Sequence, residues 1–252
     1  MNAIDSGKAC IFIPFAGGSG LSFEILRRSL SAFMPVVGVT YKGRYQSDMK
    51  QAPQTVEAMA DEVIALIDSL PVREIVIFGY SLGAIVAYEV ARRKKEFSPS
   101  LVALVVAACR APQLFSCDQV TLDSSEDAFI QTVSRFGAIP DSMLRHSAAK
   151  QRMVPSLLND FRAAARYKHA PGALIELPIT VLSGKSDPFA PVSDVVAWQE
   201  NSLFPARFEF FDGDHFFVTQ HIPIITKIII ESDTYATPLP NPFQHLETSV
   251  QI

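Results

Sequence analysis

A chain of 252 residues, 48% of them apolar, can bury the core of one full-sized domain. Its net charge of −4 argues against a nucleic-acid binder, because such proteins usually carry a strong basic excess. The first residues show no signal-peptide pattern, and no apolar stretch approaches the roughly 18 residues that span a bilayer, so a membrane protein is not expected.

Six apolar runs are predicted to be strands, and most are nearly continuous in Val, Ile, Leu and Phe, as in strands covered on both faces. They cover residues 9–15, 34–41, 73–80, 101–109, 178–184 and 206–213. Amphipathic segments at 21–33, 55–70 and 82–95 are predicted to be helices, the second capped by Thr55. This alternation predicts the α/β class, with a doubly wound, mostly parallel sheet.

The alternation breaks between residues 111 and 177, where the pattern is helical but discontinuous. The chain is therefore divided into a core of residues 1–110 and 178–231, a helical insertion at 111–177 and a tail at 232–252. The tail holds three prolines and no periodicity, and we expect it to be ordered only if it docks on the domain.

Three cysteines cannot form a disulfide framework and show no CxxC spacing. Cys10 and Cys109 lie in apolar runs and are expected to be small buried hydrophobic residues. Cys117 lies in a polar loop and is assigned no role. This usage predicts a reduced, cytoplasmic setting.

The stretch FGYSLGA contains a G-x-S-x-G pattern centred on Ser81, between a predicted strand and a predicted helix. A nucleophilic serine on such a sharp turn needs small neighbours, here Gly79 and Gly83, where the strand and helix nearly touch. Its hydroxyl would then lie over the carboxyl edge of the sheet. The alternative is a tight turn that merely contains a serine.

A nucleophilic serine also needs a base, and His215 follows the last predicted strand, so its ring is expected at the same sheet edge. The other four histidines come off no core strand end: His146 and His169 lie in the insertion, where we expect them to face solvent or a partner, His221 on a terminal helix and His245 in the tail. A loop histidine with no role is the alternative.

The acid that orients the base is predicted to be Asp187, just beyond the strand at 178–184. Asp194 lies inside the next predicted helix, and Asp212 and Asp214 are too close to His215 in sequence to reach its ring easily. A capping or turn role for Asp187 remains the alternative.

Acyl transfer also needs donors for the developing oxyanion. One is expected to be the backbone N–H of Leu82, and the other to come from the loop PFAGGSG at 14–20, where Ala16 is small enough not to block a ligand. This loop matches neither GxxxxGK[ST] nor GxGxxG, so a phosphate loop is rejected. The four segments together predict a serine hydrolase.

In this order the motifs make the chain resemble the type II thioesterases, the stand-alone α/β-hydrolases that edit polyketide and nonribosomal peptide assembly lines. The resemblance covers residues 9–231 and rests on PFAGGSG, YKGR (41–44), FGYSLGA, DFRAAARYKH (160–169), SGKSDPFAPVSDVVAW (183–198) and DGDHFFV (212–218).

The resemblance implies Ser81 as nucleophile, Asp187 as acid, His215 as base and the N–H groups of Ala16 and Leu82 as the oxyanion hole. It also implies that the insertion is a flexible lid over the acyl channel. Phe15, Tyr80 and Arg44 are further candidates for contacting the substrate. Two positions depart from the family pattern: Tyr80 stands where histidine is usual, and Lys42 replaces a proline. The first is expected to alter the pocket beside the nucleophile and with it the acyl preference, and the second to loosen a loop near the entrance.

One stretch within the insertion, residues 135–170, differs in charge from the rest of the chain. Residues 135–170 carry a net charge of +5, whereas the remainder carries −9, which gives the −4 of the whole. The seven basic residues are Arg135, Arg145, Lys150, Arg152, Arg162, Arg166 and Lys168, against Asp141 and Asp160. A basic face on an acidic protein suggests an anionic partner, although a solvated helix surface is the alternative.

The sequence and the resemblance together predict a serine thioesterase that removes stalled or aberrant acyl groups from the phosphopantetheine thiol of acyl or peptidyl carrier proteins. The mechanism needs no metal and no cofactor, and a monomer is expected, with no nucleic-acid or membrane partner. A small-molecule carboxylesterase or lipase, a medium-chain fatty acyl carrier-protein thioesterase and a catalytically inactive binding module remain as alternatives.

Overall fold

A six-stranded sheet lies at the centre of the computed structural model, which describes residues 7–45, 49–93, 99–117, 125, 128–130, 147–172 and 174–234. The strand order is β2-β1-β3-β4-β5-β6, and each neighbouring pair is parallel. The strands are β1 (Lys8–Ile13), β2 (Val36–Gly38), β3 (Glu74–Tyr80), β4 (Ser100–Ala107), β5 (Ile179–Gly184) and β6 (Arg207–Phe211). The six predicted strands and the predicted α/β class are confirmed.

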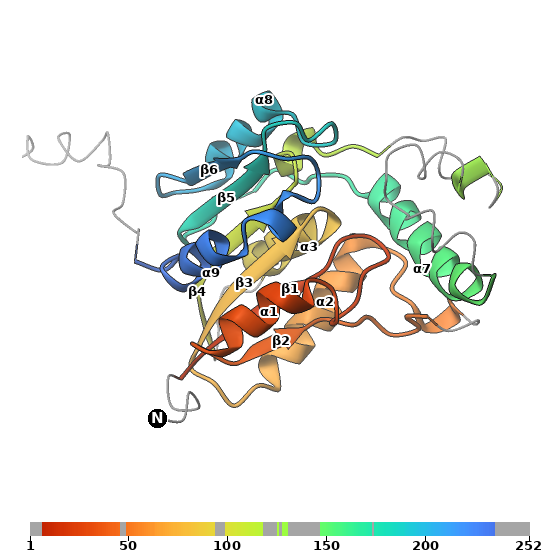
Figure 1. Ribbon diagram of the computed structural model, residues 1–252, viewed down its shortest axis with the longest axis horizontal. Helices are drawn as coiled ribbons and strands as arrows, with labels where there is room; N and C mark the ends of the chain where they lie inside the picture. The colour runs from red at the N-terminus through yellow and green to blue at the C-terminus, as the bar shows by residue number, and fades with distance from the viewer. Residues whose placement is uncertain are drawn as a thin grey trace, which may run out of the picture.

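The helices follow the predicted alternation with the strands (Figure 1). Thr55 caps α2 as predicted, since its hydroxyl accepts the Ala58 N–H at 3.1 Å. The helices are α1 (Glu24–Ser31), α2 (Val56–Asp68), α3 (Leu82–Arg93), α7 (Ser147–Arg166), α8 (Val192–Val195) and α9 (Ile222–Ile230). Short 3₁₀ turns lie at Met49–Gln51, Pro112–Leu114, Val196–Asn201 and Phe217–Gln220.

The central strands bury both faces, which explains their unbroken apolar sequence. In β3, Ile75 and Ile77 belong to the core on the side of α2 and α3. Val76 and Phe78 belong to the core on the opposite side, with α1 and α9. Figure 1 shows the two helical layers on either side of the sheet.

The described part of the insertion is dominated by α7, which lies beside the carboxyl edge of the sheet (Figure 1). The helical pattern of the insertion was predicted to be discontinuous, but α7 runs without a break from Ser147 to Arg166, through Pro155. Proline gives up one backbone hydrogen bond, but Val154 and Leu157 on either side are buried in one cluster with Phe129, which holds the helix together. The segments 118–124, 131–146 and 235–252 lie outside the described residues.

Ser81 follows β3, Asp187 follows β5 and His215 follows β6, so all three lie beyond the carboxyl ends of parallel strands. Ligands bind at this edge in open α/β sheets. Among the described residues, no helix is both long and apolar enough to cross a membrane.

Candidate active site

Ser81 sits on a sharp turn between the last residue of β3 and the first residue of α3. Its φ of 54° is in the left-handed region, and its N–H donates to the Ala107 carbonyl at 2.8 Å. The strand and helix touch here, because a Cβ on Gly79 would lie 2.4 Å from the Gly83 carbonyl oxygen. The two glycines of the motif therefore permit the contact that forces the serine outward.

The structure brings His215 and Asp187 to this serine. His215 Nε2 lies 3.1 Å from Ser81 Oγ, and His215 Nδ1 lies 2.8 Å from Asp187 Oδ2. A carboxylate can only accept hydrogen bonds, so Nδ1 carries the ring proton and Nε2 accepts from the serine hydroxyl. This is the arrangement of a nucleophile, a base and an orienting acid.

Asp187 is held in one orientation. Its side chain is fully buried, and its Oδ1 accepts the N–H groups of Phe189 at 2.8 Å and Ala190 at 3.3 Å. Oδ2 is thereby left to face His215. Asp212 and Asp214 bond elsewhere, the first to Lys185 and the second to the Phe216 N–H, in agreement with the choice of Asp187.

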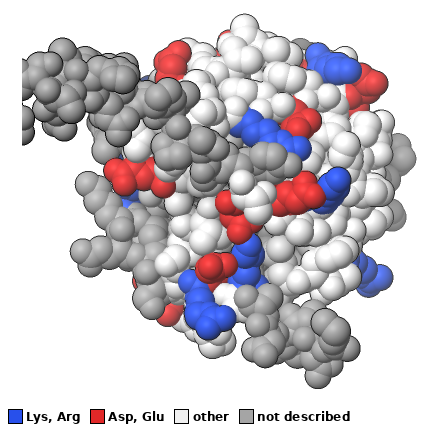
Figure 2. All heavy atoms as spheres, turned by 90° about the vertical axis from the view of Figure 1, so that its left-hand side faces the viewer, with Lys and Arg blue, Asp and Glu red and all other residues white. Residues whose placement is uncertain are grey.

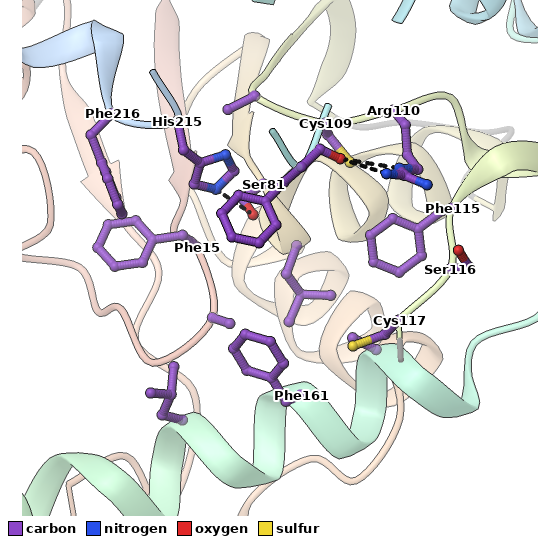
Figure 3. A pocket seen from close by; sticks show the side chains of 16 residues that line it. Phe15, Ser81, Cys109, Arg110, Phe115, Ser116, Cys117, Phe161, His215 and Phe216 are labelled. Carbon is purple, nitrogen blue, oxygen red and sulfur yellow. Dashed lines mark hydrogen bonds between the residues drawn. The ribbon is translucent and has the colours of Figure 1, made fainter. Parts of the chain in front are cut away.

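Two neighbours of these residues were not predicted from the sequence. Arg110, just after β4, donates from Nε and Nη2 to the Phe189 carbonyl at 3.1 and 2.9 Å (Figure 3). The Phe189 ring packs edge-on against the His215 ring, with 5.0 Å between centroids. Arg110 therefore fixes the loop that carries Asp187 and supports the imidazole. In the sequence, the only indication that Arg110 lies near the site was its position shortly after a core strand.

A mostly apolar cavity of about 170 Å³ opens at Ser81. Figure 3 shows Phe161 reaching into it from α7, with Phe115 and Cys117 on another wall. The lining residues are Phe15, Ala16, Ser81, Leu82, Ala108, Cys109, Arg110, Phe115, Ser116, Cys117, Leu157, Phe161, Ala164, Phe189, His215 and Phe216. Such a wall suits an acyl chain, with Ser81 and His215 at one side of the cavity to act on its carbonyl.

The backbone donors predicted for an oxyanion both border the cavity, since Ala16 and Leu82 line it. Within the described part of the chain, neither of their N–H groups donates a hydrogen bond. Both amides are therefore free to meet an oxygen of a ligand.

The three further candidates are placed differently. Phe15 lines the cavity as expected. Tyr80 is fully buried beneath the site, where its hydroxyl donates to the backbone carbonyl of His215, so it does not line the cavity. Arg44 does not line it either, because its buried guanidinium pairs with Asp160 of α7.

Burial accounts for the behaviour of two cysteines. Cys10 and Cys109 are buried, as predicted, and desolvation raises the pKa of each thiol well above its usual value. Thiolate formation is therefore suppressed, and neither residue has the character of a second nucleophile.

Comparison with known proteins agrees with this geometry. The family described as the thioesterase domain matches residues 10–232. The chain is 28% identical over 218 residues to thioesterase PikA5 of Streptomyces venezuelae, covering 86% of this chain and 77% of that protein. It is 27% identical over 225 residues to the gramicidin S biosynthesis protein GrsT of Aneurinibacillus migulanus, covering 86% of each.

Among solved structures, the type II thioesterase BorB from the borrelidin biosynthetic cluster superposes with a TM-score of 0.82 at 26% identity. The match covers 92% of this chain and 95% of that one. The chain therefore belongs to the thioesterase domain family and is a thioester hydrolase with the α/β-hydrolase fold.

Proposed function

We propose that this protein is a type II thioesterase that hydrolyses acyl groups from the phosphopantetheine thiol of carrier proteins. The observation that carries the proposal is the chain of hydrogen bonds from Ser81 through His215 to Asp187 at the mouth of an apolar cavity. The similarity to PikA5, GrsT and BorB supports the substrate class.

In the proposed mechanism, His215 Nε2 takes the hydroxyl proton as Ser81 Oγ attacks the thioester carbonyl carbon. The C–S bond then breaks, and the proton passes from His215 to the leaving thiolate. Water, deprotonated by the same nitrogen, attacks the acyl-enzyme and releases the carboxylic acid and free Ser81. Asp187 stays ionised and stabilises the imidazolium through Nδ1–H.

The N–H groups of Ala16 and Leu82 would bind the oxyanion in both steps. Leu82 is the first residue of α3, so its amide also lies at the positive end of that helix. Donors that are already in place pay no reorganisation cost when the charge develops, and one such donor contributes on the order of 10²–10³ in kcat.

The insertion at 111–177 is proposed to be a lid that also receives the carrier protein. Arg152 and Arg166 are exposed on α7, and Arg162 is half-exposed. At about 100° per residue the three span about 80° of the helix, with their centre about 120° around the axis from the buried Asp160. By contrast, the face seen in Figure 2 carries acidic and basic side chains close together. An acidic carrier domain would be steered to α7.

We further propose that the enzyme works as a monomer in the cytoplasm and edits stalled acyl units. One chain supplies every residue named at the site, which supports the monomer. Light scattering of the purified protein would test it, and a stable dimer would contradict it.

The first test compares acetyl release from an intact carrier protein with hydrolysis of p-nitrophenyl acetate, for the wild type and for Ser81→Ala. We expect a higher kcat/KM on the carrier, and a loss of about 10⁴-fold or more in the variant. Undiminished turnover by Ser81→Ala would defeat the mechanism. A preference for the oxygen ester would instead place the protein among the general esterases.

A further inference from the structure

A buried ion pair joins α7 to the loop that follows β2. Arg44 Nη1 lies 2.8 Å from Asp160 Oδ2, and each side chain is only 2% exposed. The same oxygen of Asp160 accepts the backbone N–H of Gly17 at 2.7 Å. One carboxylate of α7 therefore binds both a cation and the backbone of the loop at 14–20.

The other side of Gly17 is held as well. Its carbonyl accepts the hydroxyl of Tyr45 at 3.1 Å, and the Tyr45 N–H donates to Ser156 Oγ at 3.1 Å. The φ of Gly17 is +77°, and a Cβ there would lie 2.8 Å from the Leu157 side chain. The α7 residues Ser156, Leu157 and Asp160 thus close over this one glycine.

Gly17 directly follows Ala16, whose N–H is the proposed oxyanion donor. The Phe15 carbonyl accepts the Gly18 N–H at 2.9 Å, which closes a tight turn around Ala16. In a trans peptide the N–H points away from the carbonyl, so this turn aims the Ala16 N–H outward. The direction of that N–H therefore depends on the turn, and the turn depends on the contacts of Gly17.

Packing alone does not require a charged pair at this position, because the desolvation of two buried charges offsets much of their attraction. Burial raises the pKa of Asp160 even though Arg44 and the Gly17 N–H oppose that rise. An apolar pair of similar volume would therefore stabilise the fold about as well as the ion pair of Asp160 and Arg44 does.

We propose that Asp160 and Arg44 are positioning residues that set the oxyanion hole through Gly17. Docking of α7 onto the loop and alignment of the Ala16 N–H are then a single event, so a lid helix out of place leaves Ser81 without one of its donors. The inference rests on the proposed role of Ala16, and it adds to the proposed function a link between the lid and the chemistry.

The test is Asp160→Asn, which keeps the size of the side chain but removes its charge. We expect kcat to fall by about 10–100-fold on both the acyl-carrier substrate and p-nitrophenyl acetate, with KM changed less than about threefold. The Ki of a trifluoromethyl ketone, whose serine adduct places an oxyanion in the hole, should rise in proportion. Active sites are counted by fluorophosphonate labelling, so that unfolded protein does not enter the rates.

A milder variant is Tyr45→Phe, which removes only the hydroxyl bonded to the Gly17 carbonyl. We expect the same pattern, with a loss of about 3–10-fold in kcat. The matched control is Tyr167→Phe, which removes another contact of the α7 region with the core, the hydroxyl bond to Glu89 at 2.8 Å. It should lower Tm but leave kcat and Ki per active site unchanged.

The proposal is overturned if Asp160→Asn keeps kcat and Ki within about twofold of the wild type per active site, or if Tyr167→Phe lowers kcat equally. Neither result would touch the proposed function, which fails only if Ser81→Ala stays active or if the carrier is not the preferred substrate. The two proposals can therefore fail separately.

Discussion

Tyr80 stands just before Ser81, where the type II thioesterases that this chain resembles usually have histidine. Its hydroxyl donates a hydrogen bond to the backbone carbonyl of His215. Burial and then the negative charges of Asp187 and Asp214 raise the pKa of Tyr80, so the hydroxyl stays protonated and remains a donor. We expect Tyr80→Phe to lower kcat by about tenfold and the free energy of unfolding by about 1 kcal/mol, because the part-buried carbonyl of His215 loses its partner. Steady-state kinetics and urea unfolding measure the two effects.

Tyr41→Phe is the matched control for this change. Tyr41 is also buried, but its hydroxyl has no hydrogen-bond partner among the described residues. The same atom is deleted at no cost in hydrogen bonds, so we expect kcat to be unchanged and stability to be equal or slightly higher. Equal kcat values for the two variants would show that the bond to His215 does not position the base.

Single residues also show what the sequence could not provide. Ser81, Asp187 and His215 could be chosen because each follows a predicted strand, and parallel strands bring their carboxyl ends together. The contact of Arg110 with the Phe189 carbonyl depends on the conformation of two loops, and neither loop has a periodic pattern. Arg44 was misassigned for a similar reason, since its partner lies 116 residues away on α7.

The exposed arginines of α7 are proposed to bind the carrier protein, and this role can be tested by reversing their charge. We expect Arg152→Glu with Arg166→Glu to raise KM for the acyl carrier by about 5–10-fold at low ionic strength, and to have little effect near 1 M salt, where charges are screened. Hydrolysis of p-nitrophenyl acetate should not change, because the substitutions lie outside the cavity.

Lys227→Glu on α9 provides the control for charge alone, since its side chain is 72% exposed and α9 packs with the core on the other face of the sheet. It should leave KM for the carrier as in the wild type. An equal rise in both proteins would mean that net charge, and not the face of α7, governs association.

The end of the α7 segment carries a pH-dependent contact. His169, predicted to face solvent or a partner, instead lies half-buried, with Nε2 3.1 Å from the Tyr88 hydroxyl. Burial and then the charge of Arg92 lower its pKa below 6.5, against the opposing effect of Glu89. The folded state binds the proton less tightly than the unfolded state, so the stability is full above pH 6.5 and is lost as the pH falls through the lowered pKa.

We expect His169→Gln to reduce the fall in Tm between about pH 7.5 and about pH 5.5 by about 1 °C, because the ring is only partly buried and solvent screens its effect. Calorimetry of the variant and the wild type at both pH values measures it. An unchanged difference in Tm would assign the acid sensitivity to other groups.

At the level of elements, prediction worked where periodicity is strong and failed where tertiary packing decides. The edge strand β2 has three residues against the eight predicted, since it pairs only with β1 and no partner extends it. The continuity of α7 through Pro155 depends on Phe129, which no local pattern could reveal. Propensity is a weak prior that such contacts override.

For the whole molecule, the order of strands and helices was sufficient to predict the fold, because short connections and right-handed crossovers leave few ways to arrange a parallel sheet. The same reasoning placed the site at the carboxyl edge. The volume and walls of the cavity were beyond prediction, since Phe115 and Phe161 line it from segments far apart in the sequence.

The strand order has a consequence for synthesis of the chain on the ribosome. Ser81 and His215 are 134 residues apart in sequence, and the histidine reaches the serine only after β6 has docked on β5. A nascent chain that has folded through β4 therefore exposes a serine without its base. Hydrolysis can therefore begin only after β6 has been synthesised and has docked on β5.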